Sequence, residues 1–438
     1  MASLIIAVVT ILLIILSSLF VPTMKIKNIK IQTYWIVSLI GALLLLIFKE
    51  VELNELLNHF TSSKIGPLQI LILFISMTIL SIFLDEVNFF KYLATLVTNH
   101  TKGKQLTIFL ALYVLTSILT VFTSNDIIIL TFTPFICYFA RHTKINPIPY
   151  LIAEFIAANT WSMMLIIGNP TNIYIATYFD IDFAEYFIKM AMPTVITGIS
   201  TLLLMLLVFY KKLQEPIVLE EEHTTIKDKF LLVVGLFNLL SCTILLAVSS
   251  YINIEMWIVT LIFALSLIVS TLIYSLVKKQ KPIILANTLK RAPWNLVPFL
   301  LSMFTIVFAV TKSGALDLII NLFENTESNF IYGIVSFLAC NLLNNIPMSV
   351  LFTEILELSH ASMNNIYTVI AASNIGAFLT PIGALAGIMW LSLLKKQKLK
   401  FSFVSFMEYG AIFSIPAILI AILRMYMFSS LQIFLIKA

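Results

Sequence analysis

The sequence predicts an all-α polytopic membrane protein. We expect about ten transmembrane helices, two of them broken, and two re-entrant hairpins, arranged in two inverted repeats. Three observations favour this fold. Of the 438 residues, 60% are hydrophobic and only 11% are charged. The mean hydropathy is +1.02, a balance that excludes a soluble domain. Long apolar runs recur along the chain, and basic residues gather in alternate loops.

Fourteen apolar runs account for most of the chain. A spanning helix needs about 20 apolar residues, and two neighbouring pairs of runs are shorter than this. We expect each pair, 106–140 and 331–359, to form a hairpin that returns to its own side. Ten crossings then remain, five before residue 211 and five after residue 229. The runs lie near residues 3–21, 33–48, 67–84, 106–122, 127–140, 148–178, 188–210, 230–249, 256–277, 295–311, 331–343, 347–359, 364–394 and 402–427.

Positive charge indicates the orientation. The first run has no basic residue before it and Lys25, Lys27 and Lys30 after it, whereas a cleavable signal peptide has the reverse polarity. With both termini outside, the cytoplasmic segments hold 21 of the 27 Lys and Arg residues, as the positive-inside rule expects. The net charge of +5 is small and lies in loops, which favours membrane orientation over nucleic-acid binding. These segments are 23–32, 85–105, 141–147, 211–229, 278–294 and 395–401.

The two groups of five crossings predict two repeats. Because five is odd, the second group enters the membrane from the opposite side, which makes an inverted repeat, a frequent plan of transporters. We assign residues 1–210 to the first repeat, 211–229 to a cytoplasmic linker and 230–438 to the second repeat. Each repeat has three helices, a hairpin, a long interrupted run (148–178 and 364–394) and a last helix.

Both hairpins have polar tips, and both long runs are broken at corresponding places. The first tip, 124–126, reads Ser-Asn-Asp, and the second, 344–345, reads Asn-Asn. The breaks are Gly-Asn-Pro-Thr-Asn at 168–172 and Thr-Pro-Ile-Gly at 380–383. Proline removes a backbone donor and glycine permits non-helical dihedral angles, so we expect the helices to unwind there. Unwound backbone at membrane depth survives only where protein buries it or where it lines a cavity.

Two matched breaks, each paired with a polar tip, predict a substrate site at the membrane midplane. Two alternatives stay open: a proline kink needs no ligand, and the first hairpin could be two short, tilted spans with Asp126 in an exposed loop. A carboxylate at membrane depth is costly and indicates a function, so we expect Asp126 to carry a coupling proton. The expected substrate- or ion-binding residues are Ser124, Asn125, Asp126, Asn159, Asn169, Thr171, Asn172, Asn344, Asn345, Asn374, Thr380 and Gly383.

The sequence predicts no metal site, no cofactor and no catalytic residue. Cys137, Cys242 and Cys340 lack the paired spacing of a disulfide framework or a metal-binding motif. No Walker A, Gly-x-Ser-x-Gly or His-Glu-x-x-His motif occurs. For Glu154, a turn or two into its helix, we favour snorkelling to the cytoplasmic surface over a proton relay. We therefore expect a secondary transporter without an ATPase motif, not an enzyme.

Five stretches carry a resemblance to a known family. They are 84–90 (Leu-Asp-Glu-Val-Asn-Phe-Phe), 125–134 (Asn-Asp, then Leu-Thr-Phe-Thr-Pro), 292–295 (Ala-Pro-Trp-Asn), 344–347 (Asn-Asn-Ile-Pro) and 379–386 (Leu-Thr-Pro-Ile-Gly-Ala-Leu-Ala). Their order and spacing resemble those of the ArsB-type arsenite/antimonite efflux permeases. These permeases belong to the ion transporter superfamily, with its citrate transporter-like domain.

The resemblance implies export of As(III) or Sb(III) across the plasma (inner) membrane of a bacterium, in exchange for protons. It also implies a scaffold and a mobile transport domain, often in a homodimer, and some relatives work with a separate ATPase subunit. More distant relatives carry dicarboxylates, citrate or sulfate, or exchange sodium for protons. The expected partners are therefore a small inorganic substrate, a coupling proton or sodium ion, and the lipid bilayer.

The chain departs from the family pattern at three positions. Acidic residues occur in the family where this chain has Asn159 and Asn374, and a lysine occurs where it has Phe378. Asp126 is thus the main acidic residue of the expected site. The break at 168–172 is similar to that of the anion-permease relatives. The alternative function is therefore an inorganic anion or di/tricarboxylate transporter, for which the resemblance to those relatives implies sodium coupling.

Overall fold

The computed structural model describes residues 2–21, 23–26, 29–62, 67–100, 104–217, 224–249, 251–314, 323 and 328–437. In these residues the chain is almost entirely helical, which confirms the all-α polytopic fold. The exception is a short antiparallel pair of strands, β1 (Thr23–Ile26) and β2 (Ile29–Gln32). Part of the predicted linker, 218–223, lies outside the described residues.

The helices of the first half follow the apolar runs. They are α1 (Ala2–Phe20), α2 (Thr33–Ile47), α3 (Leu53–Ser62), α4 (Pro67–Glu86), α5 (Phe89–His100), α6 (Gln105–Phe122), α7 (Asn125–Thr143), α8 (Ile148–Trp161), α9 (Pro170–Tyr178) and α10 (Phe183–Phe209). Three single turns of 3-10 helix accompany them. These are η1 (Ser162–Met164), η2 (Ile166–Gly168) and η3 (Lys212–Gln214).

The helices of the second half follow one another in a similar order. Its helices are α11 (Lys229–Val248), α12 (Met256–Val277), α13 (Ile283–Arg291), α14 (Leu296–Lys312), α16 (Asn329–Leu343), α17 (Asn345–Leu358), α18 (Met363–Gly376), α19 (Leu385–Lys396) and α20 (Phe403–Lys437). The short helices α3 and α13 occupy equivalent places in the two halves. Neither helix was predicted from the sequence.

Seven helical segments among the described residues are long and apolar enough to cross a membrane, and α1, α2 and α16 are shorter apolar helices. Helix α6 is one of the seven, with 18 residues. It meets α7 at Thr123 and Ser124, so the run 106–140 does form two helices joined at the expected tip. The re-entrant path of this pair through a bilayer stays a prediction.

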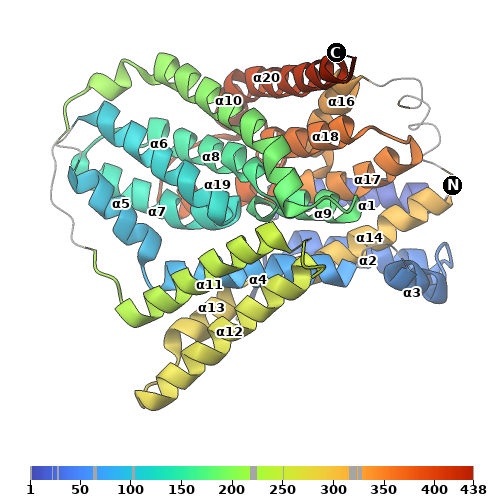
Figure 1. Cartoon of the computed structure of the whole chain (residues 1–438), viewed down its shortest axis with the longest axis horizontal. Helices are drawn as coiled ribbons and strands as arrows, with labels where there is room; N and C mark the ends of the chain where they lie inside the picture. The colour runs from blue at the N-terminus through green and yellow to red at the C-terminus, as the bar shows by residue number, and fades with distance from the viewer. Residues whose placement is uncertain are drawn as a thin grey trace.

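The helices pack in two bundles (Figure 1). We call the layer of α1, α2, α4, α11, α12 and α14 the lower bundle, from its place in Figure 1. The upper bundle contains α6 to α10 and α16 to α20. Each half of the chain contributes to both bundles, because α4 leads from the lower bundle through α5 to the helix pair α6–α7.

Contacts in one half recur in the other with the labels exchanged. Helix α2 packs on α14 as α12 packs on α4, and α6 packs on α8 as α16 packs on α18. Across the halves, α7 packs on α19 as α17 packs on α9. This correspondence is what two repeats would produce. The assignment of residues 1–210 and 230–438 to inverted repeats remains our proposal.

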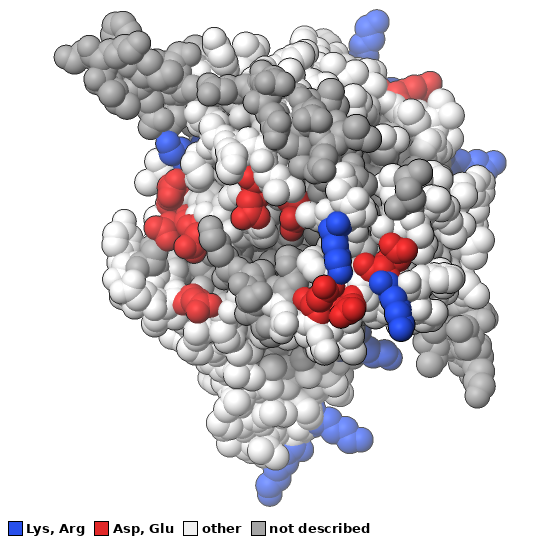
Figure 2. Space-filling model, turned by 90° about the vertical axis from the view of Figure 1, so that its right-hand side faces the viewer, with Lys and Arg blue, Asp and Glu red and all other residues white. Residues whose placement is uncertain are grey.

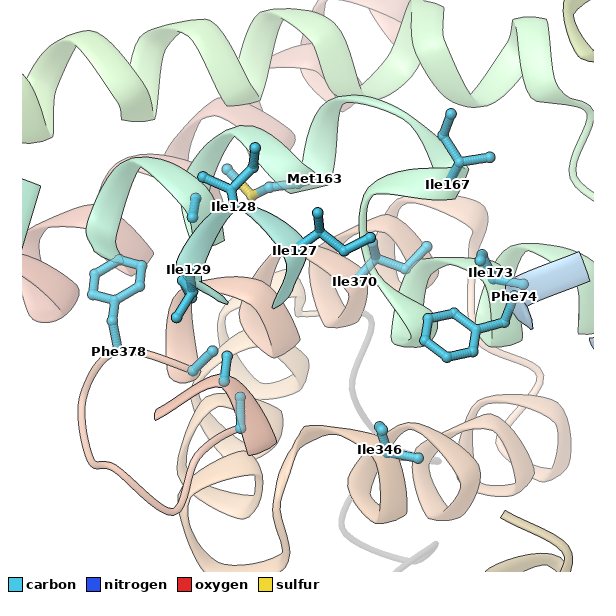
Figure 3. Packing of buried hydrophobic residues seen from close by; sticks show 14 of the residues in the cluster. Phe74, Ile127, Ile128, Ile129, Met163, Ile167, Ile173, Ile346, Ile370 and Phe378 are labelled. Carbon is cyan, nitrogen blue, oxygen red and sulfur yellow. The ribbon is translucent and has the colours of Figure 1, made fainter. Parts of the chain in front are cut away.

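The long run 148–178 breaks where the sequence predicts. Helix α8 ends at Trp161, two 3-10 turns follow, and α9 begins at Pro170, whose fixed φ suits the first turn of a helix. A Cβ on Gly168 would lie 2.2 Å from the Ser162 carbonyl oxygen, so only glycine fits this turn. Buried residues of α7 and α9 enclose the break, among them Ile128 and Ile173 (Figure 3).

Candidate functional site

A cavity of about 430 Å³ lies between the two bundles. Tyr34 and Thr78 contribute from the lower bundle, Ser124 and Asp126 from the first tip, and α19 contributes a row of residues from Leu385 to Lys396. The full lining is Thr23, Gln32, Tyr34, Phe74, Thr78, Ile82, Ser124, Asp126, Ile127, Leu130, Lys290, Arg291, Ala292, Pro293, Asn295, Leu296, Leu385, Ile388, Met389, Ser392, Leu393 and Lys396.

The first tip presents two unpartnered polar side chains to this cavity. Ser124 is only 5% exposed, and its hydroxyl has no hydrogen-bond partner among the described residues. The Asp126 side chain is half-buried, and no described residue donates a hydrogen bond to its carboxylate. The Asn125 side chain instead holds the tip, since its Oδ1 accepts from the Asp126 amide at 2.9 Å and its Nδ2 donates to Asn159 Oδ1 at 3.0 Å.

The first break is tied to α18 by a buried amide cluster. Asn374 Oδ1 accepts from Ser162 Oγ at 2.8 Å and from Asn169 Nδ2 at 2.9 Å, and Asn374 Nδ2 donates to Asn172 Oδ1 at 2.6 Å. These four residues are fully buried. Asn169 also caps α9, because its Oδ1 accepts from the Thr171 amide at 3.2 Å.

The same interface carries a second link between the halves. The hydroxyls of Thr171 and Ser373 lie 3.0 Å apart, and both residues are fully buried. The side-chain oxygen and nitrogen of both Asn374 and Asn172 have protein partners. In this conformation the cluster joins the first break to α18 and does not line the cavity.

The second tip is tied to the second break. Asn344 Nδ2 donates to the Ile382 carbonyl at 2.9 Å, and the Asn345 amide donates to the Gly383 carbonyl at 2.9 Å. Asn341 Oδ1 accepts from both the amide and the hydroxyl of Thr380, at 3.0 and 2.8 Å. Asn345 Oδ1 is buried without a partner, which leaves one acceptor of this tip unused.

The twelve expected binding residues therefore separate into groups. Ser124 and Asp126 line the cavity, and Asn344 borders a small void beside it that Tyr34 and Leu385 also line. Asn125, Asn159, Asn169, Thr171, Asn172, Asn374, Asn345, Thr380 and Gly383 hold the tips and breaks together away from the cavity. Their role in binding stays a prediction.

Several residues at these sites escaped the sequence reading. Ser162 and Asn341 anchor the two breaks. Ser162 lies one turn after the predicted residue Asn159, and Asn341 lies one turn before the predicted residue Asn344. Cys340 also belongs to the second break, since its thiol donates to the Gly383 carbonyl at 3.1 Å. Tyr34 lies about 90 residues from Asp126 in the chain, and only the fold brings them to one cavity.

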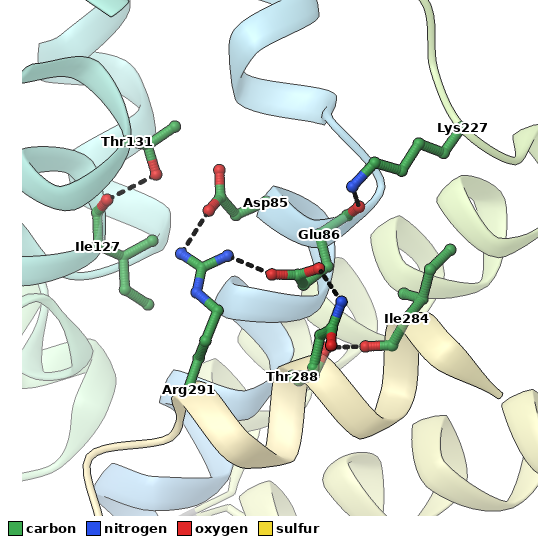
Figure 4. Close-up of polar contacts among 9 residues, drawn as sticks. Asp85, Glu86, Ile127, Thr131, Lys227, Ile284, Thr288 and Arg291 are labelled. Atoms are coloured by element: carbon green, nitrogen blue, oxygen red, sulfur yellow. Dashed lines mark hydrogen bonds and ion pairs between the residues drawn. The ribbon is translucent and has the colours of Figure 1, made fainter. Parts of the chain in front are cut away.

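A cluster of charges lies beside the cavity and explains two of the family-like stretches (Figure 4). Arg291 bridges the end of α4, with its guanidinium 2.6 Å from Asp85 Oδ2 and 2.5 Å from Glu86 Oε1. Asn287 Nδ2 donates to Glu86 Oε2 at 3.2 Å, and Lys227 Nζ donates to the Glu86 carbonyl at 2.8 Å. The stretch 84–90 is thus held against α13 just before the stretch 292–295.

Basic side chains line the cavity next to this cluster. Arg291 is neutralised by its two carboxylates, whereas Lys290 and Lys396 are exposed and make no ion pair with any described residue. The positive-inside rule predicts that these lysines lie at the cytoplasmic end, and this orientation stays a prediction.

The opposite end carries exposed carboxylates (Figure 2). They include Glu52 and Glu55 beside α3 and Glu357 at the end of α17. Lys312 binds Glu55, and this hydrogen bond lowers the pKa of the Glu55 carboxyl below its ordinary value.

The two bundles also meet in an aromatic contact, with the rings of Tyr174 and Phe304 5.1 Å apart.

Glu154 does not snorkel, and that expectation was wrong. It is only 2% exposed, and its carboxylate accepts from Thr133 Oγ1 at 3.0 Å and from Trp390 Nε1 at 3.3 Å. Because α7 and α19 close over α8 at this point, the side chain has no path to the surface.

Among the described residues, no group of three histidine, cysteine or acidic side chains could hold a metal ion.

Comparison with known proteins agrees with this architecture. A family model described as citrate transporter matches residues 11–369. The chain belongs to the citrate transporter family. It is 25% identical over 366 residues to an arsenical pump membrane protein of Escherichia coli, covering 80% of this chain and 84% of that protein. The arsenical pump membrane proteins of Yersinia enterocolitica and Shigella flexneri are 25% and 24% identical, with the same coverage.

The resemblance to the ArsB-type permeases that the short stretches suggested is confirmed by these similarities. With its apolar helices, this member of the citrate transporter family is an ion transporter of a membrane. The stretch 379–386 lies just beyond the matched residues and contains the second break.

Proposed function

We propose that the chain exports arsenite or antimonite across the plasma (inner) membrane of a bacterium, in exchange for protons. The observation that carries this proposal is the pair Ser124 and Asp126, whose side chains line a cavity between the bundles. Neither the Ser124 hydroxyl nor the Asp126 carboxylate makes a hydrogen bond with a residue that the structure describes. Arsenous acid is neutral and rich in hydroxyl groups near neutral pH. A carboxylate and a hydroxyl offer such a cargo an acceptor and a group that both donates and accepts.

Exchange follows from competition at one carboxylate. When Asp126 is ionised, its oxygens accept hydrogen bonds from the cargo hydroxyls. When Asp126 takes a proton from outside, its negative charge is lost and one oxygen becomes a donor, so the cargo is held less tightly and is released. The return of the protonated site to the cytoplasmic side, followed by loss of the proton, completes one exchange. A single carboxylate therefore allows proton or cargo, but not both, to occupy the site.

The arsenical pump membrane proteins among the relatives support arsenite as the cargo. The test is expression in arsenite-sensitive cells that lack their own exporter. We expect increased tolerance and lower accumulated arsenite. If cells with the protein confirmed in the membrane remain as sensitive to arsenite as cells without it, the assignment is refuted. The homodimer and the separate ATPase subunit that the resemblance implies stay predictions.

The second candidate is transport of an inorganic anion or a di/tricarboxylate, with sodium as the coupling ion. Lys290 and Lys396 on the cavity favour it, because basic groups at a mouth attract anions. The description of the matching family points the same way. Sodium-dependent uptake of labelled sulfate or citrate by proteoliposomes would establish this candidate in place of arsenite.

A further inference from the structure

We infer that Tyr34 of α2 is a cargo-contacting residue, which completes the Ser124–Asp126 site from the opposite bundle. This inference rests on the proposed function and deepens it. It assigns the cargo to the class of small, neutral, hydroxylated oxyacids, held by one hydroxyl from the lower bundle and two groups from the upper bundle.

The first argument is the position of Tyr34. Its side chain lines the same cavity as Ser124 and Asp126, and it also borders the small void beside Asn344. Tyr34 therefore lies between the two hairpin tips, although α2 belongs to the other bundle.

The second argument is that the Tyr34 ring is fixed. The side chain is only 8% exposed, and the ring meets Phe299 of α14 edge to face, with centroids 4.9 Å apart. Such a contact holds an aromatic ring in one orientation. The polar end of Tyr34 is thus presented to the cavity at a low cost in conformational entropy.

The third argument is that the hydroxyl is unused. The Tyr34 hydroxyl makes no hydrogen bond with any residue that the structure describes, and its oxygen is not among the buried unpartnered atoms, so it is available to a molecule in the cavity. Its polar neighbours on the same wall are satisfied. Thr78 Oγ1 donates to the Phe74 carbonyl at 2.8 Å, and Asn295 Nδ2 donates to Gln32 Oε1 at 3.1 Å.

The chemistry of the three groups selects the cargo. Tyr34 and Ser124 each carry a hydroxyl that donates and accepts, and Asp126 in its ionised form only accepts. A cargo with its own O–H groups satisfies all three at once. A fully deprotonated oxyanion would bring lone pairs against the Asp126 carboxylate, which repels it. The site therefore favours the protonated, neutral oxyacid.

The experiment compares Tyr34→Phe with a matched control, Tyr332→Phe. Tyr34→Phe keeps the ring and removes only the hydroxyl. Tyr332→Phe removes a hydroxyl that lies 2.9 Å from Ser359 Oγ and does not line the cavity. Arsenite uptake into everted vesicles is measured for both variants and the wild type, and purified protein is examined by thermal shift with arsenite.

For Tyr34→Phe we expect KM for arsenite to rise about 5- to 10-fold with the maximal rate within about twofold, as loss of one cargo hydrogen bond requires. The thermal shift at fixed arsenite should fall with it. Tyr332→Phe should keep the wild-type KM. An unchanged KM and shift in Tyr34→Phe would overturn the inference while leaving arsenite export intact. If sulfate or citrate shifts the wild type and arsenite does not, the proposed function and the neutral-oxyacid assignment both fail.

Discussion

The amides of Asn172 and Asn374 meet at 2.6 Å, and this contact joins the broken helix of one half of the chain to α18 of the other. Both residues are fully buried. The hydrogen bond is one of several that satisfy Asn374 completely, with Ser162 and Asn169 donating to its oxygen. The two halves are therefore locked together at the first break by side chains rather than by backbone.

Replacement of Asn374 should test this lock. Asn374→Ala leaves the donor Nδ2 of Asn169 and the acceptor Oδ1 of Asn172 buried without a partner among the described residues, each costing about 1–3 kcal/mol, whereas Ser162 Oγ still donates to the Asn159 carbonyl. We expect a clear loss of thermal stability in detergent. Asn374→Asp keeps the acceptor for two donors and should lose less. The exposed Asn54→Ala serves as a control, and equal melting temperatures for Asn374→Ala and this control would contradict the lock.

Asp126→Asn should abolish proton-coupled transport while leaving expression and folding intact. The amide is nearly the same size as the carboxyl, and no described residue depends on the Asp126 carboxylate for a hydrogen bond. The measurement is arsenite-driven proton movement in everted vesicles, recorded with a pH-sensitive dye at several pH values. Asp182→Asn, an exposed position, is the control. Persistence of transport together with its pH dependence would show that Asp126 is structural.

The sequence predicted the helices, the two tips and the two breaks because these depend on local patterns. Apolar length, proline and glycine act within a few residues, and the break at 168–172 occurs where Gly168 and Pro170 require it. The corresponding break at 380–383 lies between α18 and α19. Two polar tips could therefore be located without any knowledge of the tertiary structure.

The residues that line the cavity were harder to predict from the sequence. Tyr34 and Asp126 come from helices of different bundles, and no pattern along the chain links them. Asn159 and Asn374 are polar residues in apolar helices, and the sequence alone does not tell whether such a residue faces a cavity or another side chain. Here the Asn374 amide faces Asn172, and Asn159 faces Asn125. For Glu154, the sequence did not reveal that α19 covers it.

Arg291→Gln should destabilise the junction of α4 and α13. It removes both ion pairs of Arg291 and leaves Asp85 and Glu86, which are mostly buried, next to each other without a neutralising charge. Because Arg291 itself is 37% exposed, solvent screens part of the effect, and we expect a loss of about 1–3 kcal/mol. The measurement is thermal stability at low and high salt. Lys281→Gln, at an exposed basic position just before α13, should have little effect.

Glu154 should prove to be a structural tie between helices rather than a proton carrier. Its carboxylate joins α8 to Thr133 of α7 and Trp390 of α19, both fully buried. Glu154→Gln keeps a side-chain acceptor for these donors, so we expect transport with an unchanged pH profile. Glu154→Ala removes the acceptor and leaves a void, at a cost of about 2–4 kcal/mol.

Measurements on these two variants separate the roles of Glu154. Thermal stability should order the proteins as wild type, then Glu154→Gln, then Glu154→Ala. The pH dependence of arsenite uptake should be the same in the wild type and Glu154→Gln, because the amide cannot titrate and a structural tie has no need to. If the pH profile shifts in Glu154→Gln while its stability is preserved, the carboxyl carries a proton, and the exchange then involves two acids instead of Asp126 alone.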